Sequence, residues 1–299
     1  MATPPKKADP HRIKRITESI IGLPTLPTVV AKMIELVDNP RTSASSLARL
    51  IAADQALTAR ILKLANSAYY GFSREISTVN MAIVILGFNT VKDMGLSLSV
   101  FEAFKSGKGD TSFDLTRFWE HSIACGIASR MLARSYRTRY TAEAFVAGLL
   151  HDIGKVILNQ YFKNEFNAIV DAQKEGVTLE EAENAIIGTT HSQIGAWLAD
   201  KWNLPRIISR TIKYHHTPWE INKEPLFIAF IHLANYLCHI SGYGYSGRLE
   251  VVEPDERLWE IFQMENVPIE EEDVASLQTE FLLEFDKSEA FVSSLHEHT

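Results

Sequence analysis

Apolar residues recur at a spacing of three or four positions along most of this chain, and no segment alternates apolar and polar residues at a period of two. The spacing of Leu57, Ile61 and Leu64 is typical of one buried face of a helix. The pattern predicts helices over residues 79–86, 90–104, 115–135, 141–161, 164–175, 178–187, 190–202, 205–216 and 225–240. The sequence is therefore predicted to fold as an all-α protein.

Polar breaks in this pattern divide the chain into four parts. Residues 1–14 are polar and rich in Pro and Lys, which predicts a flexible leader. A short run of small and polar residues separates an N-terminal helical lobe, residues 15–108, from a helical core, residues 109–240. Residues 241–299 form a Gly- and Tyr-containing loop followed by an acidic extension. Apolar positions in that extension predict helices that pack back on the core.

Composition limits where such a chain would work. No run approaches ~18 consecutive apolar residues, so we expect no membrane span. The polar N-terminus also lacks the apolar segment of a signal peptide. Cys125 and Cys238 lie in apolar helical patterns and form no motif, which favours a reducing cytoplasm.

The net charge of −7 is unevenly distributed. Residues 1–110 are mildly basic, and most of the acidic excess follows Glu250. A basic lobe could contact an anionic partner, and two short predicted helices between Ser45 and Asn66 have the layout of a helix-turn-helix. The second of them offers only Arg60 and Lys63 as cations, fewer than a DNA-reading helix normally carries. A structural helical hairpin is therefore favoured over nucleic-acid binding.

The most distinctive segment places a histidine beside an aspartate in apolar surroundings, between Ala147 and Lys155. We expect His151 and Asp152 on one buried helix, where their side chains diverge by about 100°. A carboxylate there needs a partner, because burying an unpaired charge is costly. A metal ion would satisfy it, and so would a Lys or Arg side chain.

Four more histidines lie on or at the ends of apolar helical segments. They are His121, His191, His215 and His216. With His151 and Asp152 they could hold one or two ions if the helices converge, and such ligands suit Fe, Mn, Ni or Zn. A lone histidine would more often be a core residue. For the group as a whole, a metal site and a core cluster both stay open.

This order of residues resembles the HD superfamily of metal-dependent phosphohydrolases, and within it the HDOD family. The matching segments span nearly all of residues 15–240. They are Leu23–Pro27, Leu57–Gly71, Gly148–Lys155, Trp202–Pro205 and Tyr214–His216. The resemblance implies a helical N-terminal lobe packed on an HD-like helical core, and a role in bacterial signalling.

Three positions depart from what the resemblance to catalytic members implies. Asn235 stands where an aspartate would complete the metal ligands, and a neutral amide is a poorer ligand. Arg117 stands where the HD-GYP phosphodiesterases of cyclic di-GMP have a glutamate, one turn before the first histidine. Residues 217–220 replace the Glu and the Gly-Tyr-Pro loop of those enzymes. Arg117 could pair with Asp152 or take the place of the ion. With Asn235 and Arg117, we associate Lys155 with this site.

The prediction is a non-catalytic HDOD signalling or interaction module, with no residue assigned a catalytic role. Its partner would be a separate signalling protein of the receiver, kinase or cyclase type. The alternative is a metal-dependent phosphohydrolase acting on a nucleotide or a cyclic dinucleotide.

Overall fold

The computed structural model describes residues 28–37, 43–66, 75–104, 113–138, 140–243 and 247–286. Every regular element within these ranges is a helix, so the all-α prediction is confirmed. None of the helices described is long and apolar enough to cross a membrane. The predicted leader, Leu23–Pro27 and the linker at residues 105–110 lie outside the described residues.

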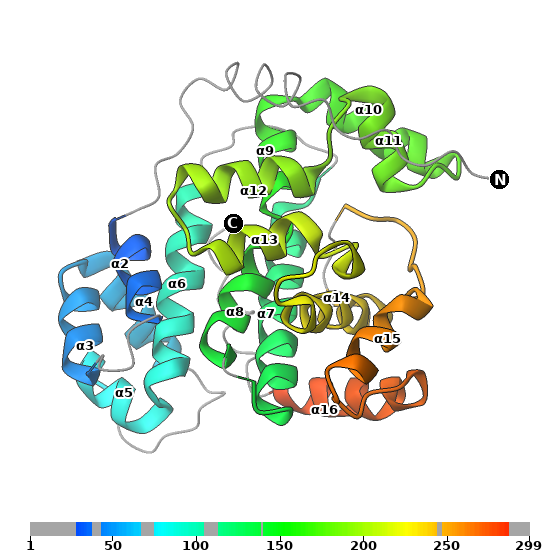
Figure 1. The fold of residues 1–299 in the computed structure, drawn as a ribbon. Helices are drawn as coiled ribbons and strands as arrows, with labels where there is room; N and C mark the ends of the chain where they lie inside the picture. Colours follow the sequence, from blue (N-terminus) through cyan, green and yellow to red (C-terminus); the bar gives the residue numbers. More distant parts are fainter. Residues whose placement is uncertain are drawn as a thin grey trace.

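The N-terminal lobe is a group of short helices packed on one longer helix (Figure 1). They are α2 (Thr28–Val37), α3 (Ala44–Ala52), α4 (Gln55–Ala65), α5 (Val79–Leu86) and α6 (Phe88–Phe104). Ser43 caps α3 by accepting a hydrogen bond from the backbone of Ser46, and Asp54 accepts one from Leu57 at the start of α4. These caps fix the tight α3–α4 hairpin that the sequence predicts.

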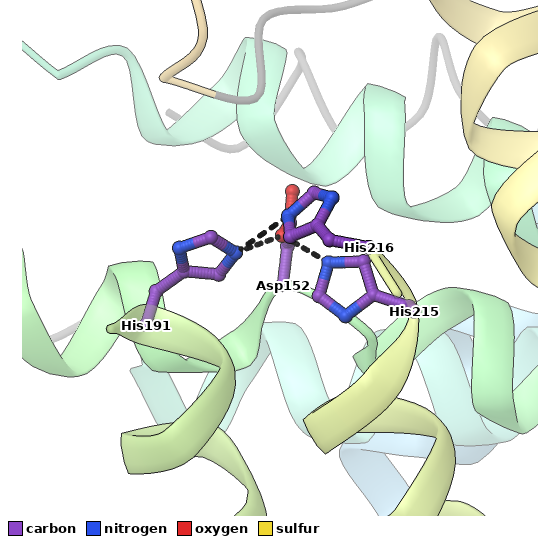
Figure 2. A group of neighbouring side chains, drawn as sticks. All are labelled: Asp152, His191, His215 and His216. Carbon is purple, nitrogen blue, oxygen red and sulfur yellow. Dashed lines mark hydrogen bonds and ion pairs between the residues drawn. The ribbon is translucent and has the colours of Figure 1, made fainter. Parts of the chain in front are cut away.

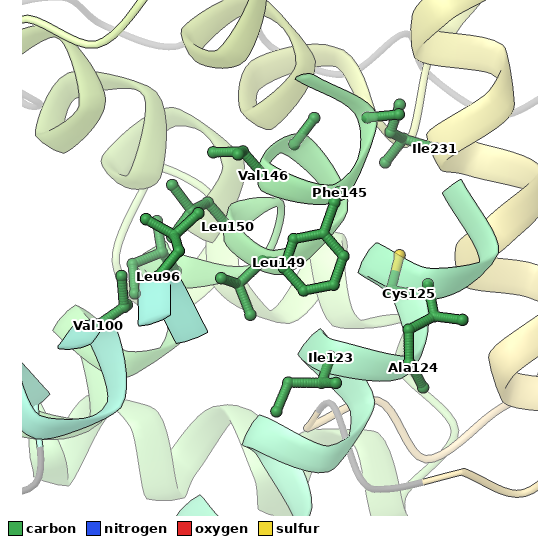
Figure 3. Packing of buried hydrophobic residues seen from close by; sticks show 14 of the residues in the cluster. Leu96, Val100, Ile123, Ala124, Cys125, Phe145, Val146, Leu149, Leu150 and Ile231 are labelled. Atoms are coloured by element: carbon green, nitrogen blue, oxygen red, sulfur yellow. The ribbon is translucent and has the colours of Figure 1, made fainter. Parts of the chain in front are cut away.

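Helix α6 connects this lobe to the core. Most of its residues are buried, including Lys92 and Asp93. A helix that is buried on nearly every side shows little amphipathic pattern. It contacts helices of its own lobe on one side and α8 (Thr141–Leu150) on the other. Leu96 and Val100 of α6 therefore share one hydrophobic cluster with Leu149 (Figure 3).

The core is built around the long helix α7 (Leu115–Ser135), which packs on α8 and α14. The helices that complete the core, α14 among them, follow α8 in chain order. They are α9 (Ile153–Tyr161), α10 (Lys163–Lys174), α11 (Leu179–Ile186), α12 (His191–Lys201), α13 (Arg206–Tyr214), the 3-10 turn η1 (Pro218–Glu220) and α14 (Pro225–Ile240). Figure 1 shows α12 and α13 above α8, with α14 beside α7.

The acidic extension packs back on the core as helices, as predicted. It contains α15 (Glu256–Met264), the 3-10 turn η2 (Glu271–Asp273) and α16 (Val274–Asp286). Helix α16 contacts α7 and α14, and the rings of Phe281 and Phe285 lie against Tyr243. Between α14 and α15, residues 247–255 pass over the side of the core where the histidines gather.

Candidate metal centre

The structure brings all six predicted ligand residues together. His121 lies in the second turn of α7, His151 and Asp152 lie between α8 and α9, and His191 is the first residue of α12. His215 and His216 follow directly after α13. Figure 2 shows Asp152 at the centre of three of these histidines.

One local prediction is wrong: residues 141–161 do not form a single helix. Helix α8 ends at Leu150 and α9 begins at Ile153, so His151 and Asp152 occupy the break. The backbone of Asp152 leaves helical geometry, with φ −103° and ψ 9°. The break turns α9 against α12, where Gly154 lies close to the backbone of His191. As a result the side chains of His151 and Asp152 meet: His151 Nε2 lies 3.3 Å from Asp152 Oδ2.

The two oxygens of Asp152 face two different sets of side chains. Oδ1 lies 3.3 Å from His191 Nε2 and 3.4 Å from His215 Nε2. Oδ2 lies 2.7 Å from Lys155 Nζ, and 4.0 Å from His121 Nε2. All of these residues are buried. The carboxylate thus divides the cluster into an Oδ1 set, with His191, His215 and His216, and an Oδ2 set, with His121 and His151.

Hydrogen bonds orient the imidazoles so that their Nε2 atoms point towards the carboxylate. His151 Nδ1 lies 2.6 Å from the carbonyl of Gly148, and His215 Nδ1 lies 2.8 Å from that of Ile212. A carbonyl can only accept, so each Nδ1 must carry the proton. In the neutral ring Nε2 then keeps its lone pair. Metal-binding histidines are oriented by the same kind of contact.

Glu183 plays this part for His191 and was missed by the sequence analysis. Its carboxylate lies 2.8 Å from His191 Nδ1 and also accepts the backbone N–H of His191. Glu183 is fully buried. Its position three and four residues from Ile186 and Leu179, on the apolar face of α11, is the signal that could have revealed it. A capping box between Thr190 and Gln193 begins α12 at His191 and holds it there.

Several buried polar atoms of the cluster have no hydrogen-bond partner. They are Nε2 of His151 and His215, both ring nitrogens of His121, and Oδ1 of Asp152. Unpartnered lone pairs in a buried site are costly, and a cation would satisfy them. Asp152, His191, His215 and His216 each offer one ligand atom within 4.8 Å of the others, and so do His121, His151 and Asp152. The residues therefore fit a divalent ion with nitrogen and oxygen ligands, such as Fe, Mn, Ni or Zn.

The other three residues associated with the site have different places. Lys155 is buried and supplies the cation beside Asp152. Arg117 lies in the first turn of α7 with its side chain exposed, so it does not reach the buried Asp152 as the sequence suggested. Asn235 is buried on α14, and its Oδ1 has no partner.

A pocket of about 360 Å³ opens beside the Oδ1 set. Its lining includes His216, Asn235, Trp219 and Tyr236. Residues of the 247–255 segment, including Arg248, complete the wall. Of the six ligand residues, His216 is the one that lines this pocket, so solutes reach the cluster beside the Oδ1 set. His121 and His151 of the Oδ2 set are fully buried.

Burial keeps several of these histidines neutral. It holds the pKa of His121 and of His216 well below the ordinary value of 6.5, and lowers the pKa of His215 to about 3 and that of His239 to about 4. Burial also opposes ionisation of Asp152, but His151 and Lys155 outweigh it and hold the pKa of the carboxyl well below 3.8. Burial also opposes a charge on His151, but the Asp152 carboxylate outweighs it and holds the pKa of His151 well above 6.5. In the same way Glu183 outweighs burial and raises the pKa of His191. The metal-free cluster thus combines neutral and charged imidazoles around an ionised carboxylate.

The metal-free protein is expected to lose stability as the pH falls from 6.5 towards 4. In this range the unfolded chain binds protons at His215 and His239, whereas the folded chain does not. Stability from a lowered histidine pKa is complete above the unfolded value and is lost below it. Each of the two should remove about 1.4 kcal/mol of unfolding free energy per pH unit. Urea unfolding in chelator at several pH values measures this slope, and a flat profile would contradict it.

A second prediction concerns Glu183. The substitution Glu183→Gln keeps the size of the side chain but removes the charge that supports His191. We expect it to weaken binding of a divalent ion about 10- to 100-fold, the usual effect of losing such an outer contact. Titration calorimetry with Mn²⁺ measures the change. Glu175→Gln, an exposed residue after α10, is the control and should bind as the unaltered chain does.

Comparison with known proteins agrees with this geometry. The HDOD domain family matches residues 23–218, about two thirds of the chain. The chain belongs to the HDOD family. An HDOD domain protein of unknown function from Geobacter sulfurreducens has a similar structure, with a TM-score of 0.82, 26% identity, and coverage of 95% of this chain and 97% of that one.

Two further similar proteins are longer than the part that this chain matches. A candidate signal transduction protein from Marinobacter aquaeolei shares the fold, with a TM-score of 0.78 and 23% identity over 96% of this chain and 64% of its own. An uncharacterised protein of Treponema pallidum is 26% identical over 203 residues, which are 67% of this chain. The match spans only 39% of that relative's length. The HDOD resemblance and the helical fold are thereby confirmed.

Proposed function

We propose that this HDOD protein is a non-catalytic signalling module that binds a divalent transition ion. The observation that carries the proposal is the buried Lys155 ammonium, 2.7 Å from Asp152 Oδ2. It places a positive charge in the Oδ2 set, where it repels a second cation. The Oδ1 set lies on the other side of the carboxylate, and its ligand atoms can still bind one ion.

Asp152, His191, His215 and His216 would hold the ion. A bound ion supplies a Lewis acid that can polarise an oxygen ligand. Hydrolysis of a phosphodiester also needs the negative charge that fixes the ion and activates water. Here the negative charge of Asp152 is balanced by its ion pair with Lys155. The Asn235 side chain that lines the pocket is a neutral amide and adds no negative charge. This charge deficit favours binding over turnover.

The proposed role in signalling is supported by membership of the HDOD family, and the site itself does not bear on it. The partner we expect is a separate protein of the receiver, kinase or cyclase type. If a bound ion changes the structure of residues 247–255, a partner that contacts this segment would bind differently to the metal-free and the metal-bound protein.

The second candidate is a metal-dependent phosphohydrolase, and the pocket beside His216 favours it. Its volume of about 360 Å³ is within the range of small-molecule sites. A nucleotide phosphate entering there would meet the ion at its open side.

Metal analysis and an activity assay separate the two candidates. Protein purified without chelator should contain a bound transition ion and should not cleave bis(p-nitrophenyl) phosphate or cyclic di-GMP. Metal-dependent cleavage that His216→Ala abolishes would instead establish the hydrolase. Asn235→Asp places a carboxylate in the pocket. Activity in that variant, with none in the unaltered chain, would support the proposal that the site lacks the negative charge needed for catalysis.

A further inference from the structure

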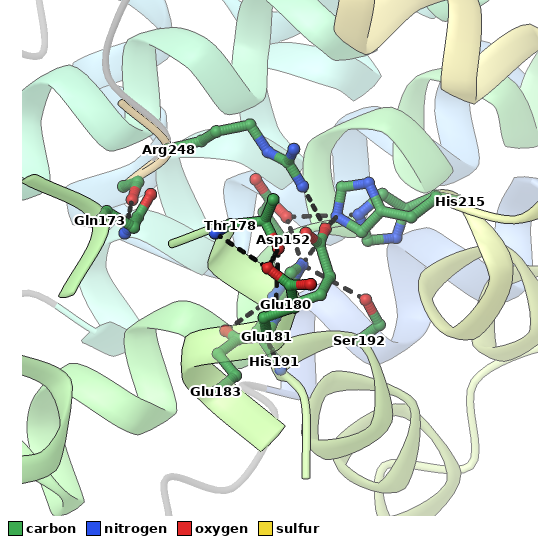
Figure 4. Close-up of polar contacts among 12 residues, drawn as sticks. Asp152, Gln173, Thr178, Glu180, Glu181, Glu183, His191, Ser192, His215 and Arg248 are labelled. Atoms are coloured by element: carbon green, nitrogen blue, oxygen red, sulfur yellow. Dashed lines mark hydrogen bonds and ion pairs between the residues drawn. The ribbon is translucent and has the colours of Figure 1, made fainter. Parts of the chain in front are cut away.

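Glu180 is an acidic residue beside the cluster that the sequence analysis did not single out. It is the second residue of α11, and its carboxylate lies on the pocket wall next to His216. Glu180 Oε1 is 3.4 Å from His216 Nε2, and the same oxygen is ion-paired with Arg248. Figure 4 shows the Arg248 side chain reaching towards Glu180 beside Asp152. About a third of the Glu180 side chain is exposed, so it has room to turn.

The charge of the cluster leaves a place for a second carboxylate. A divalent ion in the Oδ1 set would be held by three neutral imidazoles and Asp152. Because Lys155 already pairs with Asp152, the ion, the ammonium and the two buried carboxylates of Asp152 and Glu183 together would carry one net positive charge in a buried site. Such a charge is unfavourable without a further anion nearby. Glu180 is the nearest acidic side chain on the open side of the set.

The distances within the Oδ1 set are those of neighbouring ligands on one ion. Ligand bonds of about 2.0–2.2 Å place adjacent ligand atoms roughly 3.0–3.5 Å apart. His191 Nε2 and His216 Nε2 are 3.0 Å apart, and Asp152 Oδ1 is 3.3 Å from His191 Nε2. The contact of 3.4 Å between Glu180 and His216 has the same length. We propose that Glu180 supplies the second carboxylate to the ion, from the pocket side.

Arg248 competes for that carboxylate. A single amide side chain, that of the buried Gln173, holds the backbone on both sides of Arg248. Gln173 Nε2 donates to the carbonyl of Gly247 at 3.1 Å, and its Oε1 accepts from the N–H of Leu249 at 3.3 Å. Arg248 is therefore fixed over Glu180. A carboxylate bound to the ion loses part of its interaction with Arg248, so occupancy of the metal centre and the position of residues 247–255 are coupled, in both directions.

Metal titration of three variants tests this inference, which rests on the proposed metal binding. The chain is freed of metal with chelator and titrated with Mn²⁺ by calorimetry. Glu180→Gln should weaken binding about 10- to 100-fold. Arg248→Met should tighten it about fivefold or more, because Glu180 is released. Glu181→Gln, which keeps the capping contact to Thr178, is the control and should leave the affinity unchanged.

The opposite signs distinguish a ligand from a structural ion pair. If Glu180 and Arg248 only braced the pocket wall, both variants would weaken binding, and the inference would be overturned. Unchanged affinity in Glu180→Gln would overturn it as well, while leaving the proposed metal binding intact. A chain that binds no Mn²⁺ at all would refute both. With Co²⁺, the visible absorption of Glu180→Gln should differ from that of the unaltered chain, because a carboxylate ligand is lost.

Discussion

Replacing Asp152 with alanine is expected to lower the free energy of unfolding by about 3–5 kcal/mol in the absence of metal. The substitution leaves the ammonium of Lys155 buried with no carboxylate beside it. Urea unfolding followed by circular dichroism, with chelator present throughout, measures the loss. The double variant Asp152→Ala, Lys155→Met should recover most of it, because a nonpolar chain of similar size then fills the same space.

The chain contains a matched control for this pair. Asp171 and Lys174 have the same spacing along a helix and a nearly equal distance, 2.8 Å, but both side chains are well exposed. Asp171→Ala should therefore cost less than about 1 kcal/mol. If the two alanine variants cost the same, burial of Lys155 does not determine the energy of the pair.

The second large effect is expected from Gly154→Ala. A Cβ atom at this position would lie 1.9 Å from the carbonyl oxygen of His191 and 2.8 Å from the backbone nitrogen of Gly195. Both are backbone atoms, so α9 and α12 would have to separate. We expect a loss of at least about 3 kcal/mol, or no soluble folded protein. Any folded fraction should bind Mn²⁺ more weakly, because His191 moves with α12.

Gly95→Ala serves as the comparison. Its Cβ would also be crowded, at 2.7 Å, but the neighbour is the terminal carbon of Met33, which can rotate away. Alanine also favours a helix over glycine by about 1 kcal/mol. Urea unfolding should show a net change within about 1 kcal/mol of zero. A loss in Gly95→Ala as large as that in Gly154→Ala would indicate general sensitivity of the packed helices rather than a close backbone approach.

Much of the fold could be predicted because apolar spacing records which face of each helix is buried. The predicted helices at residues 115–135 and 225–240 agree with α7 and α14. The break at His151 and Asp152 could not be predicted this way, because the residues on both sides of it are apolar. The break brings α9 against α12, and apolar spacing does not record such a contact between segments nearly forty residues apart.

The candidate metal ligands could be predicted from the sequence, whereas the positions of the charged residues around them could not. Histidines in apolar helices are conspicuous, and all five lie around Asp152. Arg117 lies one turn from His121, yet it is exposed, because the first turn of α7 reaches the surface. Periodicity gives the face of a helix but not the depth at which each turn lies. Glu183 shows the converse: a charge on an apolar face has a partner that only the folded chain reveals.

The buried lysine has a consequence for how this protein would be assembled. With Lys155 paired to Asp152, the carboxylate is neutralised before any ion arrives. Under the proposed metal binding, the polypeptide would therefore reach its folded state first and take up the ion afterwards, through the pocket beside His216. This order contrasts with that of zinc fingers, in which the ion is needed for folding. It would let existing molecules, rather than newly made ones, follow changes in metal supply.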